Sequence, residues 1–177
     1  MSGTGLRPTR RIGLLAVVAL VVLALDLFSK VAVAAWLGMD HQPVRLLWGA
    51  VYLVQTRNAG AAFSVGTGAT VILTLIAVVI IVVIVRSARR MRSVGWAIAL
   101  GLVLGGALGN LADRLFRAPG IGRGHVVDWI SLFSDDGHVW PIFNIADSAI
   151  VCGAVLSALL ALRGIDLDGG RARPDRG

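Results

Sequence analysis

Long apolar segments alternate with short polar stretches along the 177-residue chain. Each of four such segments is about 18 residues long or longer, a length typical of a membrane-spanning helix. They cover about residues 12–37, 68–85, 94–116 and 143–163. No long polar linker divides them, so the pattern predicts an all-α membrane protein with four transmembrane helices. We expect one membrane-embedded domain over residues 1–164 and a polar, glycine-rich, disordered tail over residues 165–177.

The third and fourth apolar segments are rich in glycine and alanine, as in "ALGLVLGGALGNLA" and "SAIVCGAVLSALLAL". Small residues allow helix backbones to approach closely within lipid. We therefore expect these two helices to form the centre of the bundle.

Two further segments, residues 41–66 and 117–141, are too apolar to be fully solvated loops. In the first, near alternation of apolar and polar positions over residues 51–57 is typical of a strand. Trp48 and Tyr52 are amphipathic aromatic residues that favour a membrane interface. These features predict a small β-like cradle beside the four helices.

The composition agrees with a membrane protein: 56% of residues are hydrophobic and 15% charged, with a mean hydropathy of +0.81. A soluble domain has about 25% charged residues. The net charge of +7 comes mostly from arginines in short clusters next to the apolar segments. No basic face interleaved with aromatic residues accompanies them, so nucleic-acid binding is not expected.

The same clusters predict the orientation. The N-terminal tail, residues 86–92 and the C-terminal tail together carry eleven Lys and Arg, whereas the opposite side of the membrane carries six. Positive residues accumulate on the cytoplasmic side. Both termini are therefore expected inside, with the β-like cradle facing outward.

The sequence predicts no metal site. Cys152 is the only cysteine and lies within an apolar run, so we interpret it as a packing residue. His125 and His138 lack partners at metal-ligand spacing, and we expect them to be structural or interfacial. Asp135 and Asp136, in "SDDG", are typical of an exposed turn.

Polar side chains from separate parts of the chain converge at the outer ends of the predicted helices. A carboxylate inside a membrane costs about 2.5–3.5 kcal/mol on insertion scales, so such residues are functional candidates. The third and fourth segments repeat an Asn-x-Ala-Asp pattern in "GNLADR" and "FNIADS", which would place amide and carboxyl on one helix face. The converging residues are Asp26, Asn58, Asn110, Asp113, Asp128, Asn144 and Asp147.

Some of these acids have a simple structural interpretation. Asp26 lies four residues before Lys30, which is the spacing of a helical ion pair, and Asp113 is followed by Arg114. Asp128 and Asp147 have no adjacent basic residue, so for them the functional interpretation is favoured. Two neighbouring carboxyl groups that share one proton can activate water and protonate a leaving amine, as in aspartic peptidases. The residues alone do not choose between an Asp128–Asp147 and an Asp113–Asp147 pair.

Five motifs in order resemble those of the lipoprotein signal peptidase (signal peptidase II) family, over nearly all of residues 12–163. They are "DLFSK" at 26–30, "RNAGAAFS" at 57–64, "GNLADR" at 109–114, "HVVDW" at 125–129 and "FNIADS" at 143–148. The sequence differs from the family pattern at Trp129, where a smaller aromatic is expected, and in the long stretch "LFRAPGIG".

The resemblance implies a bacterial cell-membrane aspartic endopeptidase, acting without a metal or cofactor, with Asp128 and Asp147 as its catalytic pair. Its substrates would be prolipoproteins, cleaved on the amino side of a cysteine that carries a diacylglyceryl group. The enzyme would be a monomer among membrane lipids, with its active site at the outer leaflet. The residues implied to bind substrate or support the pair are Asp26, Lys30, Asn58, Gly60, Asn110, Asp113, Arg114 and Asn144.

Two other functions use similar features. A small transporter or proton-relay protein also needs membrane acids, but it commonly has polar groups on both sides of the midplane, whereas these acids cluster on one side. A scaffold that binds lipoproteins without cleaving them is the second alternative.

Overall fold

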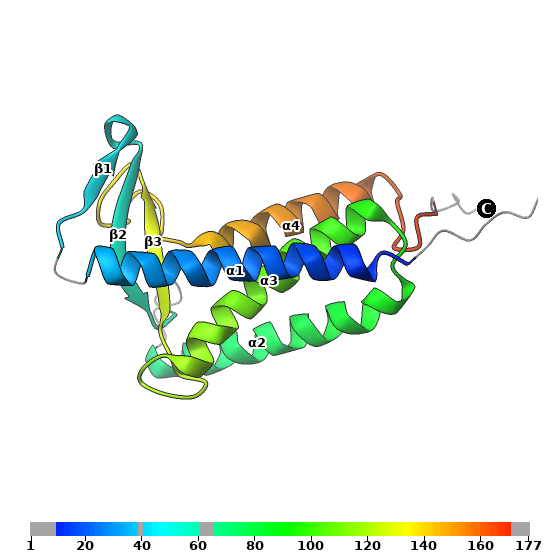
Figure 1. Cartoon of the computed structure of the whole chain (residues 1–177), viewed down its shortest axis with the longest axis horizontal. Coiled ribbons are helices and arrows are strands. Elements are labelled where there is room, and N and C mark those ends of the chain that lie inside the picture. The colour runs from blue at the N-terminus through cyan, green and yellow to red at the C-terminus, as the bar shows by residue number, and fades with distance from the viewer. Residues whose placement is uncertain (1–9, 39–40, 61–65, 171–177) are drawn as a thin grey trace, which may run out of the picture.

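A computed structural model describes residues 10–38, 41–60 and 66–170 of the chain. Four helices lie roughly side by side and a small sheet covers one end of the bundle (Figure 1). All four helices are long and apolar enough to cross a membrane, which confirms the predicted number of spans. They are α1 (Ile12–Trp36), α2 (Gly66–Ser87), α3 (Val94–Phe116) and α4 (Ile145–Leu162).

The sheet contains three antiparallel strands in the order β1-β2-β3. The strands are β1 (Val44–Leu46), β2 (Val51–Asn58) and β3 (Val126–Leu132). The strand predicted from alternation corresponds to β2, and its pairing with β3 joins the two segments that were too apolar for solvated loops. A register shift between Leu53 and Thr56 interrupts the pairing, after which Thr56 pairs with Asp128. Asp128 thus lies on a regular strand directly beside β2.

α3 has more buried residues than any other helix in the described structure, as its small residues predicted. α4, which was also expected at the centre, has four buried residues against six in α1, so α3 alone is the central helix. Gly106 faces the first turn of α4 so closely that an added Cβ would lie 2.4 Å from the carbonyl oxygen of Ala146. Gly153 of α4 has a matching contact, because a Cβ there would lie 2.6 Å from the carbonyl oxygen of Ala99. The two helices therefore meet backbone to backbone, directly below the start of α4.

A methyl group at position 106 is expected to displace the start of α4. Gly106→Ala should destabilise the protein by about 1–3 kcal/mol, the usual cost of overpacking, and should reduce any activity that depends on the first turn of α4. Gly13→Ala is the matched control, because a Cβ at Gly13 has no heavy atom within 4 Å. Denaturant unfolding in detergent micelles measures both variants. Equal stability of Gly106→Ala and Gly13→Ala would contradict the close contact.

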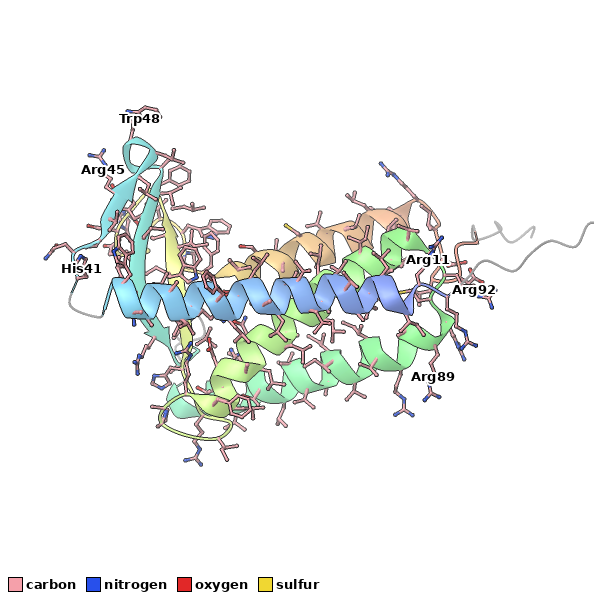
Figure 2. The ribbon with its side chains drawn as sticks, viewed as in Figure 1. Arg11, His41, Arg45, Trp48, Arg89 and Arg92 are labelled. Carbon is pink, nitrogen blue, oxygen red and sulfur yellow. The ribbon has the colours of Figure 1, made fainter. Side chains whose placement is uncertain are left out.

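The two ends of the bundle differ in charge. Arg11, Arg89 and Arg92 lie at the end opposite the sheet (Figure 2). There the segment after α4 folds back on the start of α3, where the Leu167 carbonyl accepts backbone hydrogen bonds from Arg92 at 2.9 Å and Ser93 at 3.1 Å.

Residues 165–170 were expected to belong to the disordered tail, but they are folded against this end. The Trp96 indole donates a 2.7 Å hydrogen bond to the Ile165 carbonyl, and Leu167 packs against the hydrophobic core. These long-range contacts outweigh the polar, glycine-rich local composition. Residues 171–177 lie outside the described residues.

Candidate active site

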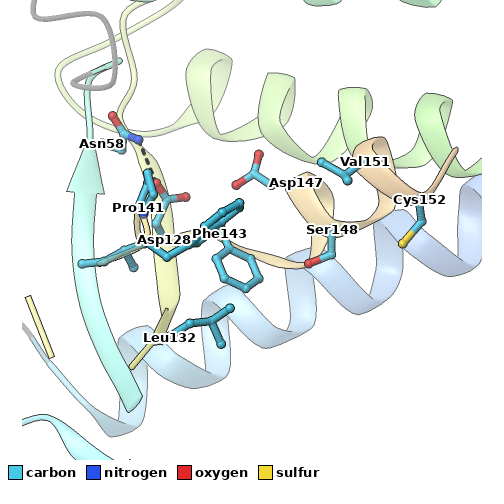
Figure 3. A pocket seen from close by; sticks show the side chains of 11 residues that line it. Asn58, Asp128, Leu132, Pro141, Phe143, Asp147, Ser148, Val151 and Cys152 are labelled. Atoms are coloured by element: carbon cyan, nitrogen blue, oxygen red, sulfur yellow. Dashed lines mark hydrogen bonds between the residues drawn. The ribbon is translucent and has the colours of Figure 1, made fainter. Parts of the chain in front are cut away.

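Asp128 and Asp147 approach the same place from different elements. Asp128 lies in the middle of β3, and its side chain shares a face of the sheet with Asn58 at the end of β2. Asp147 lies in the first turn of α4, which begins just below the sheet. The Asp147 carboxylate points toward β3 across a shared cavity (Figure 3).

Asn144 connects the two carboxylates. It is the N-cap of α4: its side-chain oxygen accepts the Asp147 backbone N–H at 2.9 Å, and its own backbone N–H donates to Asp147 Oδ2 at 3.2 Å. Its side-chain Nδ2 donates to Asp128 Oδ1 at 2.6 Å. Asn144 is fully buried, so a single rigid residue fixes the start of α4 and the position of both acids.

The Asn-x-x-Asp pattern of "FNIADS" therefore works as a capping box and not as one face of a helix. In "GNLADR" the same spacing is helical, and Asn110 and Asp113 both lie on α3. From the repeat, all four polar residues were expected at one end of the bundle, where they lie. The backbone conformation differs, because one motif lies within a helix and the other caps the start of a helix.

Each carboxylate also accepts a hydrogen bond from a second asparagine. Asn58 Nδ2 donates to Asp128 Oδ2 at 2.9 Å, and Asn110 Nδ2 donates to Asp147 Oδ1 at 2.8 Å. Gly60 holds Asn58 in turn, because its backbone N–H donates to Asn58 Oδ1 at 2.7 Å. The φ angle of Gly60 is 103°, in a region that residues with a side chain rarely adopt.

A buried ionic cluster lies behind Asn110. The ammonium group of Lys30 lies 2.7 Å from Asp26 Oδ2 and 2.9 Å from Asp113 Oδ2, and it donates to Asn110 Oδ1 at 3.1 Å. Lys30 and Asp26 are fully buried. The predicted Asp26–Lys30 ion pair is thus present, but within a larger network that orients the Asn110 amide toward Asp147.

The cluster also ties the other elements together. Asp26 Oδ1 accepts the backbone N–H of Ala146 at 3.0 Å, which joins α1 to the start of α4. Asp113 accepts the backbone N–H of Val127 at 3.2 Å, which joins α3 to β3. The cluster therefore holds the residue before each candidate acid, Ala146 through Asp26 and Val127 through Asp113.

Arg117, which the sequence analysis did not single out, is the arginine that pairs with Asp113. The neighbour in sequence, Arg114, instead donates a 3.4 Å hydrogen bond to the Asn110 carbonyl, so the expected Asp113–Arg114 pair is not formed. Helix geometry explains the difference, because residues four apart share a face whereas adjacent residues do not. The i to i+4 spacing of Asp113 and Arg117 was present in the sequence and would have identified this pair.

Burial dominates the electrostatics of Asp128. Only 2% of its surface is exposed, and burial raises its pKa from 3.8 to about 6. Hydrogen bonds from Asn58 and Asn144 oppose this rise, and the charge of Asp147 adds to it. Asp128 therefore binds a proton far more tightly than an exposed aspartate does.

Two cavities meet at Asp128. One of about 460 Å³ runs from Asp128 past Asp147 and along α4 to Val151 and Cys152 (Figure 3). The second, of about 200 Å³, lies beyond Asn58 and reaches Asp136. Both cavities share Asn58, Asp128, Pro141 and Ile142 in their linings, so an extended ligand could pass between them beside the acids.

Among the described residues, no group of three or more His, Cys, Asp or Glu could hold a metal ion. His138 pairs with Asp136 at 2.5 Å in an exposed turn, and hydrogen bonds from His138 lower the pKa of Asp136 to about 2. The interpretation of this turn as exposed is confirmed, although Asp136 also lines the smaller cavity.

Comparison with known proteins gives matches over most of the chain. The family model described as signal peptidase (SPase) II matches residues 18–163. A lipoprotein signal peptidase of Rhodococcus jostii (strain RHA1) is 52% identical over 158 residues, which cover 89% of this chain and 77% of that protein. A lipoprotein signal peptidase of Streptomyces coelicolor is 51% identical over 163 residues, covering 92% and 77%.

A solved structure gives a similar result for the fold. It is described as a bacterial membrane enzyme determined by the in meso method at 1.9 Å resolution. The TM-score is 0.76 at 26% sequence identity, and the match covers 89% of this chain and 98% of that chain. The similarity thus spans most of both chains.

Proposed function

The chain belongs to the signal peptidase II family, and from this premise we propose that Asp128 and Asp147 are its catalytic pair. It is a multi-pass membrane enzyme of the aspartic peptidase class that cleaves signal peptides from prolipoproteins. The observation that carries the proposal is the Asn144 side chain, which contacts both acids at the edge of a cavity that both acids line.

The proposed substrate is a precursor whose cysteine, just after the cleavage point, carries a diacylglyceryl group. Cleavage falls on the amino side of that cysteine. The larger cavity suits such a substrate, because it extends from the acids to the exposed, lipid-facing residues Val151 and Cys152 of α4. Both acids come from one chain, so the proposed active unit is the monomer.

The proposed orientation places the sheet and the acids at the outer leaflet. Its support is the arginine-rich opposite end of the bundle, since arginine accumulates on the cytoplasmic side of membrane proteins. The enzyme would then meet precursors after their signal peptides have crossed the membrane.

In the proposed reaction, a water molecule lies between an ionised Asp147 and a protonated Asp128. Asp147 takes one proton from the water while the water oxygen attacks the carbonyl carbon of the scissile bond. Asp128 donates a hydrogen bond to the carbonyl oxygen and then transfers its proton to the departing nitrogen as the C–N bond breaks. The products are a signal peptide with a new carboxyl terminus and a lipoprotein with a free amino terminus. Return of the proton from Asp147 to Asp128 restores the starting state.

The surroundings of the two acids support this division of roles. Asp147 lies at the N-terminus of α4, where the helix dipole favours a negative charge, and it accepts hydrogen bonds from two N–H groups. Asp128 lies in the drier position within the sheet, where burial favours the protonated form. Asn58, Asn110 and Asn144 hold the acids in place and need not take part in proton transfer.

The pH dependence of peptide cleavage tests this assignment. Because Asp128 acts as an acid, its protonated fraction falls as the pH rises above its pKa of about 6. We expect kcat/KM for a diacylglyceryl precursor peptide to fall by about tenfold per pH unit on the alkaline side, with the limb beginning near that pH. Mass spectrometry of the products locates the cleaved bond.

Asp166→Asn, a change at the far end of the bundle, should leave the alkaline limb where it is. An alkaline limb that begins several pH units higher would contradict a proton donor with the pKa of Asp128. Stable binding of intact precursor with no cleavage at any pH would favour the scaffold instead.

A further inference from the structure

A turn at the sheet end of the molecule carries large apolar side chains that the catalytic site does not use. It joins α3 to β3 over residues 117–125. Phe116, at the end of α3, and Ile121, within the turn, are each 86% exposed. In water, large apolar side chains with this exposure would be costly, so their surroundings need an explanation.

Ile121 lies in a turn whose backbone conformation is fixed by hydrogen bonds. Three backbone hydrogen bonds close it: Arg123 N to Gly120 O at 3.0 Å, Gly124 N to Arg114 O at 3.0 Å, and His125 N to Ala118 O at 3.1 Å. The backbone of the turn therefore cannot bring Ile121 into the core without breaking these bonds.

A contact with α2 fixes the depth of the turn in the membrane. The Thr74 hydroxyl donates to the Thr70 carbonyl at 2.8 Å and also lies 3.2 Å from the carbonyl oxygen of Gly122. α2 carries no charged residue before Arg86, so Thr74 lies within its uncharged, apolar part. Thr74 is twelve residues before Arg86, or about 18 Å along the helix, which is less than the hydrocarbon thickness of about 30 Å. With Arg86 at the opposite boundary, Thr74 and the Gly122 carbonyl beside it lie inside the hydrocarbon of the leaflet beside the sheet.

The charges next to the turn suit the boundary between hydrocarbon and headgroups. Arg123 is exposed beside the apolar tip, and Arg117 remains 28% exposed while it pairs with Asp113. Arginine side chains at such a position extend toward lipid phosphates while their methylene groups lie along the acyl chains.

We propose that residues 116–123 form a membrane-inserted wedge, with Phe116 and Ile121 in the hydrocarbon of the leaflet beside the sheet and Arg123 at its phosphates. The partner is bilayer phospholipid, and the surface is continuous with the lipid-facing side of α2. The wedge and the hairpin tip that carries Trp48, 93% exposed, lie on opposite sides of α1 (Figures 1 and 2). Two anchors on opposite sides would hold the sheet at a fixed height above the bilayer.

Site-directed spin labelling tests the depth of the wedge directly. Cys152 is the only cysteine, so a Cys152→Ser background allows one label at a time. The test position is Ile121→Cys, in vesicles of phosphatidylcholine and phosphatidylglycerol. His41→Cys, exposed at the sheet end, is the water reference, and Leu75→Cys, 60% exposed on α2, is the lipid reference.

Collisions with oxygen report lipid and collisions with a water-soluble nickel chelate report water. We expect the oxygen-to-nickel ratio at position 121 to be several-fold higher than at position 41 and to approach that at position 75. A ratio at 121 equal to that at 41 would overturn the proposal. If Ile121→Cys does not fold, Phe116→Cys is read by the same criterion. The readout is independent of peptide cleavage, so failure of the proposed catalytic pair would leave this test unaffected.

Discussion

Replacing Asp147 or Asp128 by asparagine is expected to lower kcat for a lipidated precursor peptide by about 10²–10⁴-fold, the usual contribution of general acid–base catalysis. Asparagine keeps the shape of aspartate but has neither a carboxylate to accept the proton of water nor a carboxylic acid to donate one. At position 147 the negative charge at the start of α4 is also lost. At position 128 the amide oxygen can still accept the hydrogen bond from Asn144, whereas the amide nitrogen cannot accept the one from Asn58. One hydrogen bond is therefore lost, while the fold of the site should persist.

The measurement is steady-state cleavage by purified protein in detergent, with precursor binding measured in parallel. Asp135→Asn, in the exposed turn, is the matched control and should cleave at the wild-type rate. Either catalytic variant should still bind the precursor. Wild-type cleavage by Asp128→Asn or by Asp147→Asn would exclude the pair as the catalytic centre.

The second large effect is expected from Lys30→Met, which should lower the stability of the protein more than its catalytic rate. Lys30 is fully buried and balances the carboxylates of Asp26 and Asp113, which are themselves 0% and 2% exposed. Removing one partner of a buried ionic cluster leaves uncompensated charge and typically costs about 3–5 kcal/mol. The Asn110 amide also loses the group that orients it toward Asp147, so the remaining folded enzyme should be less active.

Two further variants test whether the loss of stability is specific to this buried cluster or follows from removing any long cationic side chain. Arg89→Met, at an exposed site at the end of the bundle opposite the sheet, should change the free energy of unfolding by less than about 0.5 kcal/mol. In the Lys30→Met background, Asp26→Asn with Asp113→Asn removes the uncompensated charges and should recover part of the lost stability. Denaturant unfolding in bicelles measures all of them. Lys30→Met with wild-type stability would contradict the structural role of the cluster.

The helices could be predicted from the sequence because length and apolar composition alone identify a membrane span. The strand pairing was harder, since β1 is three residues long and β3 is a short apolar run without clear alternation. Residues 165–170 show the limit of local composition, because one leucine and a tryptophan hydrogen bond bring them onto the bundle.

The sequence identified the residues of the candidate site, but not the hydrogen bonds and ion pairs that join them across elements. Spacing identified the Asp26–Lys30 pair, since both lie on one helix. The contact of Lys30 with Asp113 links two helices, and one sequence does not reveal which helix faces are in contact. For the same reason the sequence left Asp113 and Asp128 as alternatives. Lys30, Arg117 and the Val127 N–H surround Asp113, whereas Asp128 lines the cavity, and this difference supports the proposed Asp128–Asp147 pair.

The central claim is that Asp128 and Asp147 together hold the water that attacks the peptide bond. An experimental structure at a resolution that shows ordered water would test it most directly. We expect one water molecule within hydrogen-bonding distance of an oxygen of Asp128 and an oxygen of Asp147 at once. Carboxyl oxygens too far apart for a single water to bridge, both without and with a bound substrate analogue, would contradict it.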